Sequence, residues 1–156
     1  MKRIRYEDGA LDAADRRILA LLAEDARLPV AEAARRVGLS APAVGERIRR
    51  LEEAGVILGW RAEVSSAALG RPLEALLRVR PVPGELPRVA KILAETPQIT
   101  RCDRVTGEDC FLARAALRSV QELETVIDRL IPYAMTNTSL IQSTPVPERL
   151  PPLTEA

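Results

Sequence analysis

The stretch VAEAARRVGLSAPAVGERIRRLEEAG, residues 30–55, predicts two helices joined by a tight turn. The turn falls at Gly38-Leu39-Ser40, and Ser40 is a suitable N-cap because its hydroxyl can accept from backbone N–H groups that a new helix leaves unpaired. Pro42 stands in the first turn of the second helix, where a missing N–H costs little. Gly55 predicts the end of that helix, at its C′ position.

The second helix of this stretch carries an apolar stripe and a basic surface. Val44, Ile48 and Leu51 recur at i, i+4 and i+7, so they share one face. Three arginines lie off that face. A short turn containing glycine followed by an arginine-rich helix is the helix-turn-helix layout, in which the second helix enters a DNA major groove. The expected DNA-contacting residues are Ser40, Ala41, Pro42, Ala43, Glu46, Arg47, Arg49 and Arg50.

Each of these expectations has a structural alternative. The three arginines are either DNA contacts or a solvated helix face, and Ser40 is either a cap or a base reader. Ala41 and Ala43 are small enough to touch thymine methyl groups. Gly45 costs about 1 kcal/mol relative to alanine in a helix interior. It either permits close approach to the DNA backbone or is simply tolerated.

The composition is that of a folded protein without a strong overall field. The 156 residues are 47% hydrophobic and 29% charged, which suits one medium domain or two small ones. Aromatic residues make up only 3%, which argues against a single-strand binder built on base stacking. The net charge is +1, so DNA affinity has to come from local arginine clusters, and more than one copy is expected to be needed.

Several other classes of protein are disfavoured. We expect a cytoplasmic protein with no membrane contact, because no apolar run approaches about 20 residues and the start lacks a signal-peptide pattern. The chain has no histidine, which excludes a Cys/His zinc site and a histidine-based triad. The sequence has no phosphate-cradling loop and no nucleophile elbow, so we expect no enzymatic activity, no bound metal and no cofactor. Cys102 and Cys110 are interpreted as small apolar residues, with a redox switch as the alternative.

The rest of the chain divides into further predicted elements. A helix over residues 11–26, capped by Asp12, precedes the stretch above, and residues 1–10 read as a polar arm. Residues 56–64 contain β-branched and aromatic residues, which predicts an extended wing or linker strand. Strands are predicted over 73–79, 99–106, 110–117 and 135–145, with helices over 86–95 and 120–130, the latter capped by Ser119. This β-α-β-β-α-β order is the ferredoxin-like split βαβ arrangement.

The predicted fold class is therefore α+β, with four parts. Residues 1–64 form a three-helix winged helix-turn-helix head with its wing or linker strand, and residues 65–72 form a hinge. Residues 73–147 form the ferredoxin-like domain, and residues 148–156 form a proline-rich tail.

Four segments in order resemble the Lrp/AsnC family, the feast/famine regulators of bacteria and archaea. They are LDAADRRILALLAEDAR (11–27), VGLSAPAVGERIRRLEEAGVI (37–57), VTGEDCFLAR (105–114) and TNTSLIQSTPV (136–146). Each segment alone is common, but the four in order are specific. The resemblance implies a RAM-type C-terminal domain and homodimers whose sheets pair, often assembling further into tetramers or octamers. It also implies binding to double-stranded DNA, controlled by an amino acid or related metabolite.

The resemblance also implies where an effector binds. It points to the turn between the second and third strands and to the Thr/Ser-rich last strand. The residues concerned are Thr106, Gly107, Glu108, Asp109, Cys110, Thr136, Thr138 and Ser139. The family often carries an acid where Cys110 stands, so this position departs from the family pattern, and Asp109 or Glu108 is the alternative partner for a ligand amino group. The alternatives are a hairpin turn with its acids in water and threonines alternating on an exposed strand.

Two other functions fit the same sequence. One is an architectural DNA-compacting protein without an effector, which would bind DNA broadly and respond to no ligand. The other is a metabolite-binding or enzymatic βαββαβ protein whose head only mediates assembly, and whose function would survive the loss of Arg47, Arg49 and Arg50.

Overall fold

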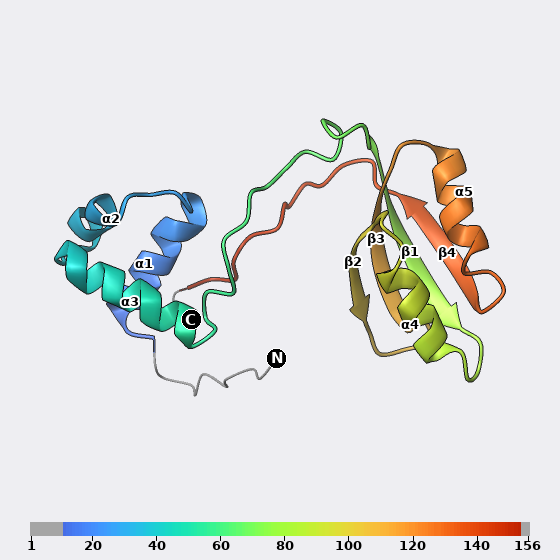
Figure 1. Ribbon diagram of the computed structural model, residues 1–156, viewed down its shortest axis with the longest axis horizontal. Coiled ribbons are helices and arrows are strands. Elements are labelled where there is room, and N and C mark those ends of the chain that lie inside the picture. The colour runs from blue at the N-terminus through green and yellow to red at the C-terminus, as the bar shows by residue number, and fades with distance from the viewer. Residues whose placement is uncertain (1–10, 154–156) are drawn as a thin grey trace. The chain divides into compact units, whose positions relative to one another are not determined.

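Three helices make up the N-terminal part of the chain: α1 (Ala13–Glu24), α2 (Val30–Val37) and α3 (Ala41–Glu53) (Figure 1). They belong to a computed structural model that describes residues 11–153, so the expected polar arm at 1–10 and the last three tail residues lie outside the described residues. The chain divides into two compact units. One holds the described residues up to Ala62 together with those from Val146 onward, and the other holds Glu63–Pro145.

The predicted caps set the helix boundaries. Asp12 caps α1 by accepting from the Asp15 N–H at 2.8 Å, and Asp15 accepts from the Asp12 N–H at 3.3 Å, which completes a capping box. Ser40 Oγ accepts from the Ala43 N–H at 3.3 Å and begins α3 as predicted. Gly38 has φ of 78°, a left-handed conformation that ends α2 and turns the chain toward α3.

The core of the head is small and aliphatic. Its buried side chains come from all three helices, and Ile48 of the predicted α3 stripe packs against them while partly buried. The buried side chains are Ile18, Leu22, Ala33, Ala34, Val37 and Val44. Leu51 is also fully buried. This packing fixes which sides of α3 remain at the surface.

The strand expected at residues 56–64 is not formed. Among the described residues the only sheet is built from strands of the second half, so 56–64 is a linker without strand hydrogen bonds. Ile57 is partly buried against the head core, whereas Leu58 is 92% and Trp60 47% exposed. Trp60 Nε1 donates to Glu52 Oε1 at 2.6 Å. The tail returns to this first unit, where Arg16 Nη1 donates to the Leu153 carbonyl at 3.1 Å.

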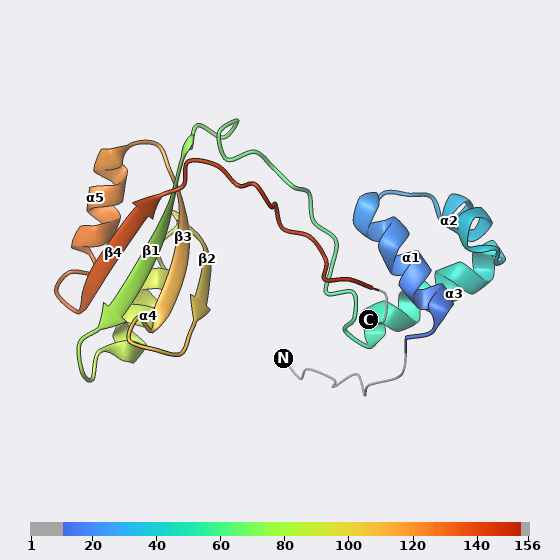
Figure 2. The ribbon, with the colours of Figure 1, turned by 180° about the vertical axis from the view of Figure 1, so that it is seen from behind.

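The second unit is the predicted βαββαβ fold. Its strands are β1 (Leu73–Pro81), β2 (Ile99–Arg104), β3 (Phe111–Leu117) and β4 (Ala134–Leu140), in the antiparallel order β2-β3-β1-β4. Helices α4 (Leu86–Ala94) and α5 (Val120–Asp128) pack on one face of the sheet (Figures 1 and 2). β4 ends at Leu140 rather than at Pro145, and just beyond it the Ile141 N–H donates to the Glu74 carbonyl at 2.8 Å.

Alternation along the strands leaves the other sheet face uncovered. Ala75, Leu77 and Val79 of β1 are fully buried against the helices, whereas Leu76 and Arg78 between them are exposed. No helix among the described residues has the length and apolarity needed to cross a membrane.

Candidate functional site

Two of the three α3 arginines are bound to a carboxylate that lies inside the head. Asp15 is 0% exposed, and its Oδ1 accepts from Arg47 Nη1 at 2.7 Å while its Oδ2 accepts from Arg50 Nη2 at 2.8 Å. The same Arg47 nitrogen donates to Asp12 Oδ2 at 2.7 Å. The Asp15 N–H and then Arg47 lower the pKa of Asp12. The hydrogen bonds that Arg47 donates to Asp15 and Asp12 raise the pKa of Arg47. These contacts fix α3 against the N-terminus of α1.

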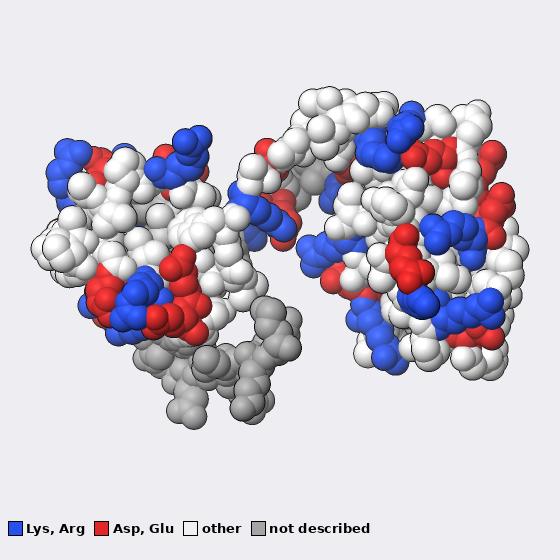
Figure 3. Space-filling view, in the orientation of Figure 1, with Lys and Arg blue, Asp and Glu red and all other residues white. Residues whose placement is uncertain are grey.

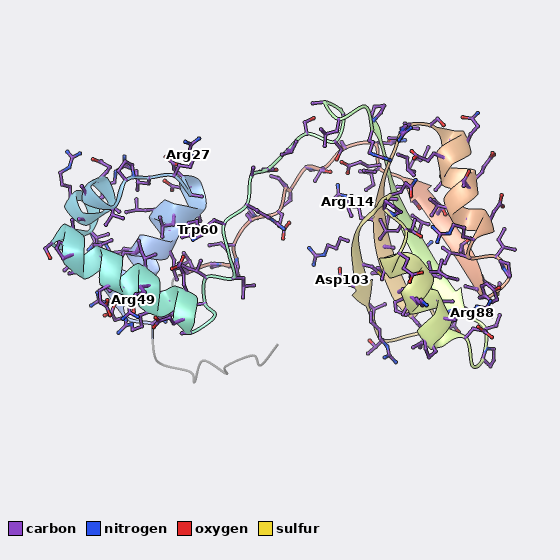
Figure 4. The ribbon with its side chains drawn as sticks, viewed as in Figure 1. Arg27, Arg49, Trp60, Arg88, Asp103 and Arg114 are labelled. Atoms are coloured by element: carbon purple, nitrogen blue, oxygen red, sulfur yellow. The ribbon has the colours of Figure 1, made fainter. Side chains whose placement is uncertain are left out.

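The third arginine, Arg49, is bound by two glutamates of α3 itself. Arg49 Nε and Nη2 donate to the two Glu46 carboxylate oxygens at 3.0 and 2.5 Å, and Nη1 pairs with Glu53. The hydrogen bonds with Arg49 lower the pKa of Glu46 and raise that of Arg49. Figure 3 shows acidic and basic side chains interleaved over the region of α3, and Figure 4 shows Arg49 on the outside of the helix.

The start of α3 presents small residues to the surface. Pro42 is exposed and Ala43 and Gly45 are partly exposed, while Ser40 is used as the cap. A Cβ added at Gly45 would meet no heavy atom within 4 Å. Packing inside the protein therefore gives no reason for glycine at this position.

On the sheet unit, the turn between β2 and β3 is held by an arginine of the neighbouring strand. Gly107 has φ of 108°, which the turn requires and which favours glycine. Arg80 of β1 pairs with Glu108, and its Nε lies 3.7 Å from Asp109 Oδ1. The acids of the turn thus have a cationic partner instead of facing only water.

The expected effector residues of β4 do not share one side of the sheet. Thr136 and Thr138 pair with the buried Val79 and Leu77, so they lie on the helix-covered face, whereas Ser139 pairs with the exposed Leu76. Thr138 Oγ1 is buried with no hydrogen-bond partner, the only such side-chain atom among residues 11–153. Ser139 is also three residues further along β4 than Thr136, which is a distance of about 10 Å in a strand.

The two cysteines are not cross-strand partners. Cys102 pairs in the ladder with Ala113, while Cys110 precedes Phe111, whose partner is Arg104. Both thiols are free, and partial burial and then Asp103 raise the pKa of Cys102, which disfavours the reactive thiolate. This arrangement gives no support to a redox switch.

Sequence reasoning missed the role of Asp15, although the signal was present. Asp15, Ile18 and Leu22 stand at i, i+3 and i+7 of α1, so a carboxylate occupies the apolar stripe. A buried carboxylate needs a cation or hydrogen-bond donors, and in the structure Arg47 and Arg50 of α3 supply them.

Both units match domains of known regulators. Residues 11–52 match the AsnC-type helix-turn-helix domain, and residues 74–151 match the Lrp/AsnC ligand binding domain. The HTH-type transcriptional regulator LrpC of Bacillus subtilis is 32% identical over 85% of this chain and 92% of its own length, and the leucine-responsive regulatory protein of Rhizobium meliloti is 37% identical over 75% and 77%.

Solved structures show the same architecture. The structure of B. subtilis LrpC matches with a TM-score of 0.83 at 31% identity, covering 88% of this chain and 99% of that one. A feast or famine regulatory protein from M. tuberculosis, complexed with L-methionine, matches with a TM-score of 0.81 at 31% identity, covering 90% and 98%. With both of its units matched in order, the chain belongs to the Lrp/AsnC family of transcriptional regulators.

Proposed function

We propose that this protein is a cytoplasmic, homo-oligomeric regulator whose α3 helix enters the major groove of double-stranded DNA. The observation that carries this proposal is the coincidence of α1–α3 with the matched helix-turn-helix domain at residues 11–52. Of the three α3 arginines, Arg49 is the one whose recorded partners all lie on α3 itself and not on α1, so it is our candidate for base contact. Arg47 and Arg50 act mainly by holding α3 in position.

The effector in this proposal is an amino acid or a related metabolite, bound at the turn over residues 106–110. The L-methionine complex of the M. tuberculosis relative supports this choice. Arg80 beside Glu108 and Asp109 offers a positive and a negative group within one cluster, which suits the carboxylate and ammonium groups of a zwitterion.

The partner on the uncovered sheet face is, in this proposal, a second copy of the chain. That face exposes apolar side chains, with Leu76 at 39% and Met135 at 67% exposure. Arg114 Nη2 lies 2.7 Å from Glu74 on the same face, so both charge signs are available for a self-complementary contact. Dimers of this kind can assemble further into tetramers or octamers.

Ligand control follows from differential affinity. A ligand bound between subunits favours the assembly to which it binds more tightly. That assembly sets how many heads engage one DNA molecule at once, and multivalent engagement amplifies the difference in affinity.

A thermal-unfolding scan against a panel of single amino acids tests the effector half. A ligand at 100 times its dissociation constant adds about 2.7 kcal/mol of stability, which shifts the midpoint measurably. One amino acid that raises the midpoint supports the proposal. A flat panel, combined with broad DNA binding, would favour an architectural protein instead.

A further inference from the structure

We propose that Glu46 is a specificity-determining residue of the α3 surface. In the free protein its carboxylate holds Arg49, and in the specific DNA complex the carboxylate accepts a hydrogen bond from a cytosine amino group instead, which releases Arg49. This inference rests on the proposed binding of DNA through α3. It follows from the charges on that helix.

The Glu46–Arg49 contact occupies the part of the guanidinium that DNA would need. Nε and Nη2 of Arg49 both donate to Glu46, and Nη1 pairs with Glu53. Two parallel N–H donors of this kind are what an arginine offers to guanine O6 and N7, or to a phosphate. Arg49 therefore cannot make a two-point contact with DNA while both carboxylates remain in place.

Arg49 is the one α3 arginine with a recorded hydrogen bond to Glu46, although the charge of Arg50 also lowers the pKa of Glu46. Arg47 and Arg50 are bound to the buried Asp15, on the side of the helix that meets α1. Over residues 11–62 nine arginines stand against eight carboxylates, and no lysine or histidine is present. The head thus has little surplus positive charge, so a single carboxylate in the DNA-contacting surface changes its affinity for DNA.

Random and specific DNA then affect Glu46 differently. Against phosphates alone, release of Arg49 leaves the Glu46 carboxylate facing anions without a donor, which opposes binding. Against a base pair whose cytosine N4 amino group faces α3, Glu46 accepts from that amino group and Arg49 becomes free for a guanine. Glu46 and Arg49 are one helical turn apart, so the two bases belong to neighbouring base pairs.

The test compares the full chain with Glu46→Ala and with the matched control Glu24→Ala, which removes the same charge from an exposed site on α1. Two duplexes serve as probes: an alternating A·T duplex of about 30 base pairs, and the best G·C-containing site that wild type selects from a random library. Dissociation constants are measured over a salt series, and melting temperatures confirm that each variant is folded.

We expect Glu46→Ala to bind the A·T duplex about two- to fivefold more tightly than wild type, as expected for release of an exposed ion pair. The slope of log K against log salt should steepen by about 0.9, one additional phosphate contact. The variant should also lose the preference for cytosine at one position of the selected site. Adding Arg49→Gln to Glu46→Ala should remove the increase in slope, because the released Arg49 makes the additional phosphate contact.

Equal behaviour of Glu46→Ala and Glu24→Ala on both duplexes would overturn the inference, because only net charge would then matter. A wild-type chain that binds neither duplex would refute the proposed function itself. The two failures are distinguished by the wild-type measurement.

Discussion

Arg47 Nη1 lies 2.7 Å from Oδ1 of Asp15, a carboxylate with no exposed surface. This contact joins the helix expected to enter DNA to the first turn of α1, and Arg50 adds a second bond from the same helix. The orientation of α3 therefore depends on a buried charge as well as on apolar packing. Substitution of Arg47 or Arg50 therefore affects the stability of the head as well as the basic surface of α3.

Replacing Arg47 and Arg50 together with alanine leaves Asp15 as a buried charge without a cationic partner. We expect a loss of about 3–5 kcal/mol in the free energy of unfolding of the head. Urea denaturation of the full chain measures it. Adding Asp15→Asn to the double variant should recover part of the loss, because a neutral amide is less costly to bury. No recovery would mean that the arginines contribute by packing alone.

Gly45→Ala should stabilise the protein by up to about 1 kcal/mol. The reason is that alanine has the higher helix propensity and that a Cβ at this position has open space around it. Thermal unfolding measures the gain. If α3 approaches the DNA backbone closely at Gly45, the same variant binds duplex DNA more weakly despite its higher stability. Unchanged binding would show that the glycine is only tolerated.

Thr138→Val should raise stability by about 1–3 kcal/mol. The substitution removes a buried hydroxyl that has no hydrogen-bond partner and keeps a β-branched side chain in the strand. Chemical denaturation compares the two proteins. The same variant should lose its response to the effector if that hydroxyl binds the ligand. A destabilised variant would indicate that the hydroxyl has a partner in the assembled protein.

Acid should weaken the sheet unit through Glu122. The Arg118 N–H at 2.6 Å, then Gln98 and Arg71, lower the pKa of Glu122 to about 2 from its ordinary value of 4.5. Because the folded pKa is depressed, the contribution is present above pH 4.5 and is lost as the pH falls toward 2. The stability difference between wild type and Glu122→Gln should shrink over that range. A difference that stays constant over this pH range would contradict a stabilising role of the Glu122 carboxylate.

Local signals in the sequence predicted most of the fold. Asp12, Ser40 and Ser119 mark helix starts by hydrogen bonds within three residues, so their neighbours suffice to identify them. Residues 56–64 show the limit of this reasoning. Their β-branched and aromatic residues favour an extended chain, but a strand also needs a ladder partner, which local sequence does not supply.

The candidate sites were less predictable because they depend on contacts across the fold. The spacing of Arg47, Arg49 and Arg50 indicated only that they leave the apolar stripe, not that two of them bind Asp15, more than 30 residues earlier. In β4, strict alternation already separates Thr136 and Thr138 from Ser139. The position of Arg80 beside the turn over residues 106–110 follows from the strand order and not from sequence spacing.

The most direct test of the account is the affinity of the full chain for a duplex from its own promoter region, measured between about 50 and 200 mM salt. We predict binding that weakens steeply with salt, and a variant Arg49→Ala that loses about 1–3 kcal/mol of binding free energy and relaxes the preference at one base position. Absence of salt-sensitive binding by the wild-type chain would contradict the assignment of α3 as a DNA-binding helix.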